Sequence, residues 1–129
     1  MGETASAGTM HIGELAERTG LSLRTIRHYD EVGLLKPTGR TEGGFRLYTR
    51  EDIGRLMVIR RMKPLGFTLQ EMTELLHVID ALGGGGAGSD NPGVRAELDS
   101  FIAQAMERRT NLQQQLAMAD EFLELLRAQ

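Results

Sequence analysis

The chain has 129 residues and no Cys, which excludes disulfides, thiolate metal sites, iron–sulfur clusters and thiol redox sensing. A chain of this length forms one small domain, or one domain with an extension. The net charge of −3 conceals two unlike halves. Residues 11–68 contain 11 Lys and Arg against 7 Asp and Glu, and residues 69–129 contain 4 against 10. This asymmetry indicates that only the first half meets a polyanion.

The first ten residues are small and mostly polar, and we expect a disordered tail over 1–10. They lack the charged and apolar pattern of a secretory leader. No apolar run in the sequence is long enough to cross a bilayer, so no membrane partner is expected. The expected compartment is the cytoplasm.

Two short helices are predicted next. Apolar residues at helical spacing predict a helix over 11–18, and Gly20 suits the left-handed residue that follows a helix. Ser22 is an acceptable N-cap for a second helix over 23–32. Two short helices joined by a turn that contains Gly form a helix-turn-helix, in which the second helix reads DNA.

The second predicted helix carries side chains suited to DNA. Arg24 lies at its N-terminal end, where a guanidinium can bind guanine with two hydrogen bonds or hold a phosphate. Thr25 and Tyr29 can donate to phosphate oxygens, and core packing is an equal alternative for Tyr29. His28 has no second ligand at helical spacing, which favours a surface or phosphate-facing role over metal binding.

A Gly-rich hairpin is predicted over 38–48, after a turn that Lys36 opens. Arg40 and Arg46 flank its loop, and residues 45–48 alternate as on a strand. A two-stranded ribbon is marginal alone, so it must lean on the helices. A solvent-exposed hairpin without a role is the alternative. Arg and aromatic residues beside a helix-turn-helix favour a wing that contacts DNA.

Two further helices complete the predicted DNA-binding domain over 11–82. Thr49 and an acidic residue three positions later form a variant capping box, and Pro64 ends the helix that follows. Thr68 and Glu71 form a full capping box for a helix that runs to about residue 82.

The segment 83–93 is rich in Gly and is predicted to be a flexible linker. Its four consecutive Gly do not form a phosphate-binding loop, because no strand precedes them and no Lys-Ser/Thr follows. No convergent acid–base set, metal set or nucleophile–base pair is visible anywhere in the sequence. We therefore expect no enzyme activity, no cofactor and no metal.

A single long helix is predicted over 94–127. Nine of its residues follow alternating spacings of four and three, and eight of the nine are apolar, as in a coiled-coil seam. A helix folded back on its own domain is the alternative. Self-association is favoured because no partner for so long a seam remains in the chain. The predicted dimerisation residues are Leu98, Ile102, Ala105, Arg109, Leu112, Leu116, Ala119, Leu123 and Leu126.

These segments together resemble the MerR family of bacterial transcription regulators, over roughly residues 11–126. The matching stretches are His-Ile-Gly-Glu-Leu-Ala at 11–16, Thr-Gly-Leu-Ser at 19–22, and Thr-Ile-Arg-His-Tyr-Asp-Glu-Val-Gly-Leu-Leu at 25–35. Gly-Phe-Arg-Leu-Tyr at 44–48 and Leu-Gly-Phe-Thr-Leu-Gln-Glu-Met at 65–72 continue the series.

The resemblance implies a mainly α fold, namely a winged helix-turn-helix with a long C-terminal helix that forms an antiparallel coiled-coil homodimer. It implies a regulator that distorts promoter DNA at an inverted repeat, with RNA polymerase as a further partner and a nucleoid-associated location. The expected DNA-binding residues, on the residues' own chemistry and on the resemblance, are Ser22, Arg24, Thr25, Arg27, His28, Tyr29, Lys36, Arg40, Phe45, Arg46 and Tyr48.

The sequence leaves the effector open. Metal and redox sensors of the family sense through Cys, which is absent here, and no cluster of residues argues for a small-molecule effector. The main alternative function is a DNA-architectural or excisionase-like winged-helix protein without a promoter role. A long dimer helix argues against it, because fixed half-site spacing suits palindromic sites.

Overall fold

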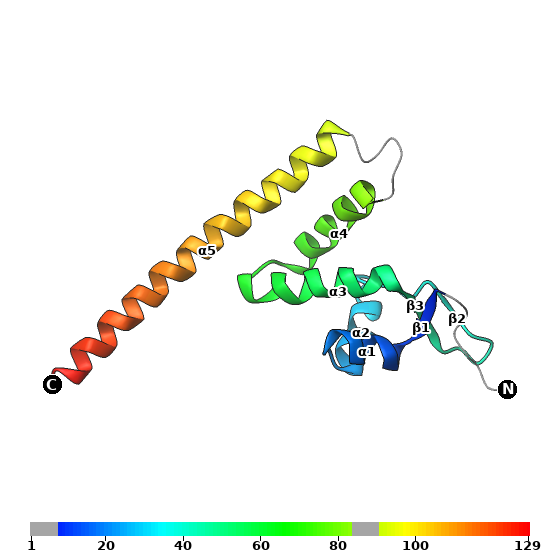
Figure 1. The fold of residues 1–129 in the computed structure, drawn as a ribbon, viewed down its shortest axis with the longest axis horizontal. Helices are drawn as coiled ribbons and strands as arrows, with labels where there is room; N and C mark the ends of the chain where they lie inside the picture. The colour runs from blue at the N-terminus through cyan, green and yellow to red at the C-terminus, as the bar shows by residue number, and fades with distance from the viewer. Residues whose placement is uncertain (1–7, 84–90) are drawn as a thin grey trace. The chain divides into compact units, whose positions relative to one another are not determined.

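The computed structural model describes residues 8–83 and 91–129. The chain divides into two units, one ending at Thr73 and one beginning at Glu74, and each is described by itself. Helices dominate both units, and the first also holds a small sheet (Figure 1), which confirms the predicted fold class. The elements are β1 (Thr9–His11), α1 (Ile12–Thr19), α2 (Leu23–Glu31), β2 (Gly39–Arg40), β3 (Arg46–Thr49), α3 (Arg50–Met62), the 3₁₀ turn η1 (Lys63–Leu65), α4 (Leu69–Gly83) and α5 (Pro92–Arg127).

The turn between α1 and α2 is built by short polar contacts. Gly20 has φ +73°, and its backbone N–H donates to the carbonyl of Ala16, so α1 ends in a left-handed residue as predicted. The Ser22 hydroxyl accepts from the backbone N–H of Thr25 at 3.0 Å and caps α2. From α3, a guanidinium nitrogen of Arg60 donates to the carbonyl of Thr19 at 2.6 Å, which fastens the turn to the rest of the unit.

The sheet is antiparallel with strand order β1–β3–β2. Its edge strand β1 corrects the predicted tail over 1–10, because Thr9 and Met10 pair with β3 and Met10 is buried. His11, expected inside the first helix, ends β1 instead. Burial of Met10 opposite Tyr48 stabilises this pairing, and no pattern local to the first ten residues reveals it. Residues 1–7 lie outside the described part of the chain.

The core of the first unit lies where α1, α2, α3 and β3 meet. Leu15, Ile26, Tyr48, Leu56 and Ile59 are its fully buried large side chains. Each comes from an element with one apolar face, so their burial fixes which faces of α1 and α2 stay in solvent. Complete burial of these side chains removes the largest apolar areas from water and supplies most of the stability of the unit.

The predicted caps of α3 and α4 are confirmed. The backbone N–H of Thr49 donates to Asp52 Oδ2 at 2.9 Å. The backbone N–H of Thr68 donates to Glu71 Oε1 at 2.9 Å, and the Thr68 hydroxyl accepts from the N–H of Glu71 at 3.1 Å. Both are capping boxes, whose geometry is set within four residues and is therefore readable from sequence.

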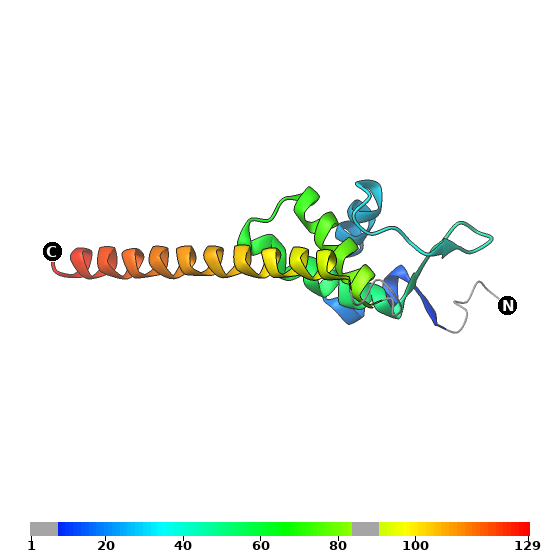
Figure 2. The ribbon, with the colours of Figure 1, turned by 90° about the horizontal axis from the view of Figure 1, so that it is seen from above.

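Helix α5 contains 36 residues, which corresponds to about 54 Å. It begins earlier than predicted because the Asn91 side chain accepts from the backbone N–H of Gly93 and Pro92 occupies the first turn. The predicted linker over 83–93 is therefore shortened at both ends, and 84–90 lies outside the described residues. No residue of α5 is buried, and Figure 2 shows the helix as one straight rod.

Candidate nucleic-acid interface

Helix α2 presents a basic face to solvent. Arg24, Arg27 and His28 are exposed, whereas Ile26 and Tyr29 are buried. Arg27 and His28 follow Arg24 by three and four positions, so all three residues share one side of the helix. The sequence predicted these positions. Leu23 and Val32, near the two ends of the helix, are each 39% exposed. The cationic side chains of helix α2 therefore face solvent, opposite a narrow apolar stripe that faces the core.

The N-terminus of α2 is locked by its own side chains. Besides capping the helix, the Ser22 hydroxyl lies 2.8 Å from the hydroxyl of Thr25. Each hydroxyl keeps spare hydrogen-bonding capacity, because a hydroxyl has one donor and two acceptor positions. Ser22 and Thr25 thus hold the first turn in place beside Arg24. Their direct contact with DNA remains a prediction.

A basic hollow of about 490 Å³ borders this face. Lys63, in η1, enters it from outside the helix-turn-helix, with its Nζ 6.0 Å from the centre of the Tyr29 ring. Tyr29 was expected either in the core or at the interface, and it is buried yet lines the hollow. Lys63 was missed, because no local pattern in the sequence places residue 63 beside α2. The hollow is lined by Arg24, Thr25, Arg27, His28, Tyr29, Glu31 and Lys63.

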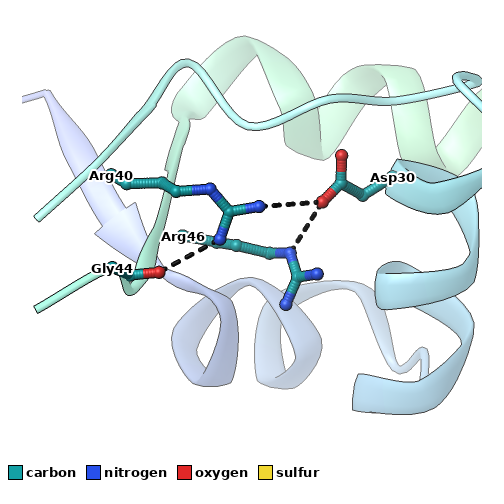
Figure 3. A network of polar contacts seen from close by, with 4 residues as sticks. All are labelled: Asp30, Arg40, Gly44 and Arg46. Atoms are coloured by element: carbon teal, nitrogen blue, oxygen red, sulfur yellow. Dashed lines mark hydrogen bonds and ion pairs between the residues drawn. The ribbon is translucent and has the colours of Figure 1, made fainter.

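The β2–β3 hairpin is tied to α2 by one carboxylate (Figure 3). Arg46 Nε donates to Asp30 Oδ2 at 2.8 Å, and Arg40 Nη2 donates to the same oxygen at 3.4 Å. Arg40 Nη1 also donates to the carbonyl of Gly44 at 3.0 Å, across the hairpin. The sequence predicted both arginines as DNA contacts and missed Asp30, because nothing local pairs residue 30 with the hairpin.

This ion pair shifts the titration of Arg46. The hydrogen bond to Asp30 raises the pKa of Arg46, against a smaller opposing effect of burial. Asp30 itself is buried, with a residue exposure of 8%, and is one of the few polar core residues in the described part of the chain. A buried carboxylate of this kind needs cationic partners, and the hairpin supplies two.

The tip of the hairpin carries an exposed aromatic ring. Phe45 is 61% exposed and makes an edge contact with the His11 ring, with centroids 6.5 Å apart. Gly44 has φ +86°, and its N–H donates to the carbonyl of Thr41, which closes the tight turn just before Phe45. Lys36, on the approach to the hairpin, is also exposed. These positions agree with a wing that faces a ligand.

Tyr48 is the correction to the predicted site. It was expected on the wing surface, but its side chain is fully buried, so it cannot reach a ligand outside. Burial raises the pKa of Tyr48, and its hydroxyl is the one buried side-chain polar atom without a hydrogen-bond partner among residues 8–83 and 91–129. Alternation along β3 places Arg46 and Tyr48 on the same face. Tyr48 pairs with the buried Met10 of β1 and is fully buried, whereas the Arg46 side chain is 23% exposed.

The predicted dimerisation residues are all on α5 and unburied. Leu98 and Ala105 are half-buried, and the other seven are exposed, with Leu116 at 63%. A second apolar set was not predicted at all: Met118, Phe122 and Leu125 are each at least 59% exposed. Their spacing from the seam places them on another side of the helix.

The family is decided by two sequence matches. Residues 10–78 match the model described as MerR HTH family regulatory protein, and residues 53–128 match the model described as MerR, DNA binding. The chain belongs to the MerR family. Between them the two matched regions cover the helix-turn-helix, the hairpin and α5, so the resemblance drawn from the sequence motifs is confirmed.

Individual MerR relatives match over about half of this chain. The mercuric resistance operon regulatory protein of Bacillus cereus is 48% identical over 69 residues, which are 54% of this chain and 52% of that protein. The HTH-type transcriptional regulator ZntR of Escherichia coli is 46% identical over 67 residues, 52% of this chain and 48% of that protein. The chain thus spans about half the length of these relatives, both of which are named as regulators.

Solved structures of MerR-family regulators share the fold. A transcriptional regulator from Bacillus cereus is 30% identical with a TM-score of 0.60, over 92% of this chain and 75% of that chain. HiNmlR, described as a regulator lacking the sensor domain and bound to promoter DNA, is 26% identical with a TM-score of 0.63, over 90% of this chain and 79% of that chain.

No helix within residues 8–83 or 91–129 has the length and apolar character that a membrane crossing needs.

Proposed function

We propose that the chain is a sequence-specific DNA-binding transcriptional regulator that acts as a homodimer on an inverted-repeat operator. The observation that carries the proposal is the outward basic face of α2, bordered by a hollow that Lys63 completes. Membership of the MerR family and the likeness to HiNmlR bound to promoter DNA support it. The proposed division is a DNA-binding region from β1 to α4 and a dimerisation helix, α5, which adjusts the predicted bounds of 11–82 and 94–127 to the observed elements.

The roles of the α2 residues follow from their exposure. Arg24 and Arg27 are exposed cations on a helix narrow enough to enter a major groove, where Arg binds guanine with two hydrogen bonds. His28 and Lys63 lie at the same hollow and contact phosphates. Thr25 and Ser22 hold the first turn, and Tyr29 supports the floor of the hollow.

The hairpin acts as the wing. Phe45 at its tip and the arginines behind it lie beside the groove-entering helix, because Asp30 links both elements. Arg40, Arg46 and Lys36 then contact the sugar–phosphate backbone, which fixes register without reading sequence. Tyr48 is not part of this surface, since it is buried.

Two copies pair through α5. A helix of 36 residues without one buried side chain exposes a long seam that is apolar except at Arg109, and self-association would cover it. An antiparallel pair would hold two reading helices at a fixed separation, which suits an inverted repeat. We further propose that the bound dimer distorts promoter DNA for RNA polymerase. A small-molecule effector would act by shifting that distortion, and no residue cluster identifies its class.

Selection of bound duplexes from a random pool tests the proposal. The wild-type protein should enrich an inverted repeat, and its binding should weaken steeply with salt, by about 0.9 in log K for each neutralised phosphate per unit of log salt. Arg24→Ala should lose the preference at one or two base pairs per half-site. Arg95→Ala, an equal charge change on α5, should select the same sequence as the wild type.

Scattered footprints without a repeat would contradict the proposal and would favour a DNA-architectural role. Equal behaviour of the Arg24→Ala and Arg95→Ala variants would show that α2 is not the reading helix.

A further inference from the structure

Asp30 has an unfavourable position for a carboxylate. It lies in the last turn of α2, where the helix dipole disfavours negative charge, and its side chain is only 11% exposed. It also lies on the helix proposed to approach a polyanion. The carboxylate of Asp30 is instead contacted by the two hairpin arginines.

The geometry at Arg46 shows what Asp30 does. The Asp30 carboxylate accepts a hydrogen bond from the Nε–H of Arg46. Neither terminal nitrogen of Arg46 has a protein acceptor within the described part of the chain. Figure 3 shows these two nitrogens turned away from Asp30. A planar guanidinium held at Nε has a fixed orientation and keeps its terminal N–H groups for a second anion. The Arg46 side chain is 23% exposed, so a ligand can reach it.

Arg40 extends the same arrangement across the hairpin. It spans Asp30 and the carbonyl of Gly44, so one side chain connects the end of α2 to the turn at the hairpin tip. Its 3.4 Å contact with Asp30 is longer than that of Arg46, and its side chain is 47% exposed. Arg46 is therefore the principal partner, and Arg40 fixes the angle of the hairpin.

We propose that Asp30 is a positioning residue that holds the wing against the reading helix and presents the terminal nitrogens of Arg46 to a DNA phosphate. This inference rests on the proposed function, because it names how one cation of the DNA surface is oriented. Asp30 touches no DNA itself. It acts through Arg46, and its negative charge lowers affinity less than the orientation of Arg46 raises it.

The sign of one substitution separates positioning from simple charge repulsion. Asp30→Asn removes a negative charge near DNA, so repulsion alone predicts tighter binding. Positioning predicts binding that is weaker by roughly tenfold, with the salt slope reduced by about 0.9 because one phosphate contact is lost.

The matched control is Glu31→Gln on the same helix. Glu31 lines the basic hollow, and no ion pair involving it is recorded among the described residues, so its removal should tighten binding roughly two- to threefold at low salt.

Two further variants test whether Asp30 acts through Arg46. In the Arg46→Ala background, Asp30→Asn should no longer weaken binding, since the group that it orients is gone, and should show only the two- to threefold tightening expected from removing a negative charge. Arg46→Lys keeps the positive charge but loses the planar guanidinium, which can donate to Asp30 and to a phosphate at the same time. It should therefore weaken binding nearly as much as Arg46→Ala. Circular dichroism of each variant monitors the fold, and Arg46→Lys serves if Asp30→Asn does not fold. Tighter binding by Asp30→Asn, additive losses in the double variant, or wild-type binding by Arg46→Lys would each overturn the proposal.

The free protein provides a readout that does not depend on DNA. The Nε–H resonance of Arg46 should exchange slowly with water in the wild type and rapidly in Asp30→Asn, while that of exposed Arg127 should exchange rapidly in both. If the wild type bound no DNA but Arg46 kept its slow exchange, the proposed function would fall and the Asp30–Arg46 contact would stand. Rapid exchange at Arg46 in the wild type would overturn the inference itself.

Discussion

The first unit and helix α5 differ in what covers their apolar side chains. In the first unit, Leu15, Ile26, Leu56 and Ile59 are fully buried by the chain's own elements. In α5, none of 36 residues is buried, although the helix carries a regular apolar seam. The difference teaches that the two regions depend on different partners for stability. The first unit is stabilised by its own core, whereas we propose that α5 is stabilised by a second copy of the chain.

Core truncation should give the largest effect and would confirm that the first unit is stabilised from within. Leu56→Ala removes a fully buried side chain and should lower the free energy of unfolding by about 2–5 kcal/mol. Leu125→Ala, at a position that is 65% exposed and off the predicted seam, should change it by less than about 0.5 kcal/mol. Urea unfolding followed by circular dichroism measures both. Similar losses at the two positions would remove the contrast between the regions.

A charge in the seam tests the other side of the comparison. Leu116→Glu should raise the dimer dissociation constant about a hundredfold, because two apolar contacts are replaced by two desolvated carboxylates. Met118→Glu is the matched control, since Met118 is similarly exposed but lies on another side of α5. Sedimentation equilibrium reads the association directly. Dissociation by Met118→Glu with Leu116→Glu intact would move the interface to the second apolar set.

Two glycines with positive φ, Gly20 and Gly33, allow the contribution of the Arg60–Thr19 contact to the stability of the first unit to be measured. A Cβ at Gly20 would lie 2.9 Å from a guanidinium nitrogen of Arg60, whereas nothing lies within 4 Å of a Cβ at Gly33. Both residues have φ between +70° and +80°, so both substitutions by Ala incur a similar backbone strain of about 1 kcal/mol. Gly20→Ala should cost roughly 1 kcal/mol more, because it also displaces Arg60 from Thr19. Equal thermal stabilities of the two variants would show that the Arg60 contact contributes little.

The smallest effect is expected inside the core, at the Tyr48 hydroxyl. Tyr48→Phe removes a buried polar atom that has no partner within the described residues, and it should stabilise the protein by about 1 kcal/mol at neutral pH. Burial raises the pKa of Tyr48, so folding favours the neutral phenol. The wild type should therefore lose stability as pH rises above about 10, the ordinary pKa, and through the raised value. Denaturation at pH 7 and pH 11 should show a larger advantage for Tyr48→Phe at the higher pH.

Features set by neighbouring residues were predictable from the sequence. The capping boxes at Thr49 and Thr68 and the left-handed Gly20 each depend on contacts within four residues. The exposed basic face of α2 also followed from local spacing, because helical periodicity divides a face from its core. The hairpin and the long terminal helix were also predicted from residue patterns within their own segments, and both are present.

Features set by distant residues were not predictable. Strand β1 exists because Met10 is buried opposite Tyr48, and this pairing joins residues far apart in the chain. The same contact buries Tyr48, which the family resemblance had assigned to the wing surface. Asp30 and Lys63 were missed for a similar reason, since their partners in the hairpin and in α2 are not sequence neighbours.

The most direct test of the central claim is hydroxyl-radical footprinting of the wild type and of Leu116→Glu on a selected duplex. The account predicts that the wild type protects two half-sites related by a two-fold axis. Leu116→Glu should protect half-sites only at much higher protein concentration, and protection of one half-site should not depend on protection of the other. A single asymmetric footprint from the wild type, or an unchanged symmetric footprint from Leu116→Glu, would contradict the claim that the first unit reads DNA while α5 pairs two copies.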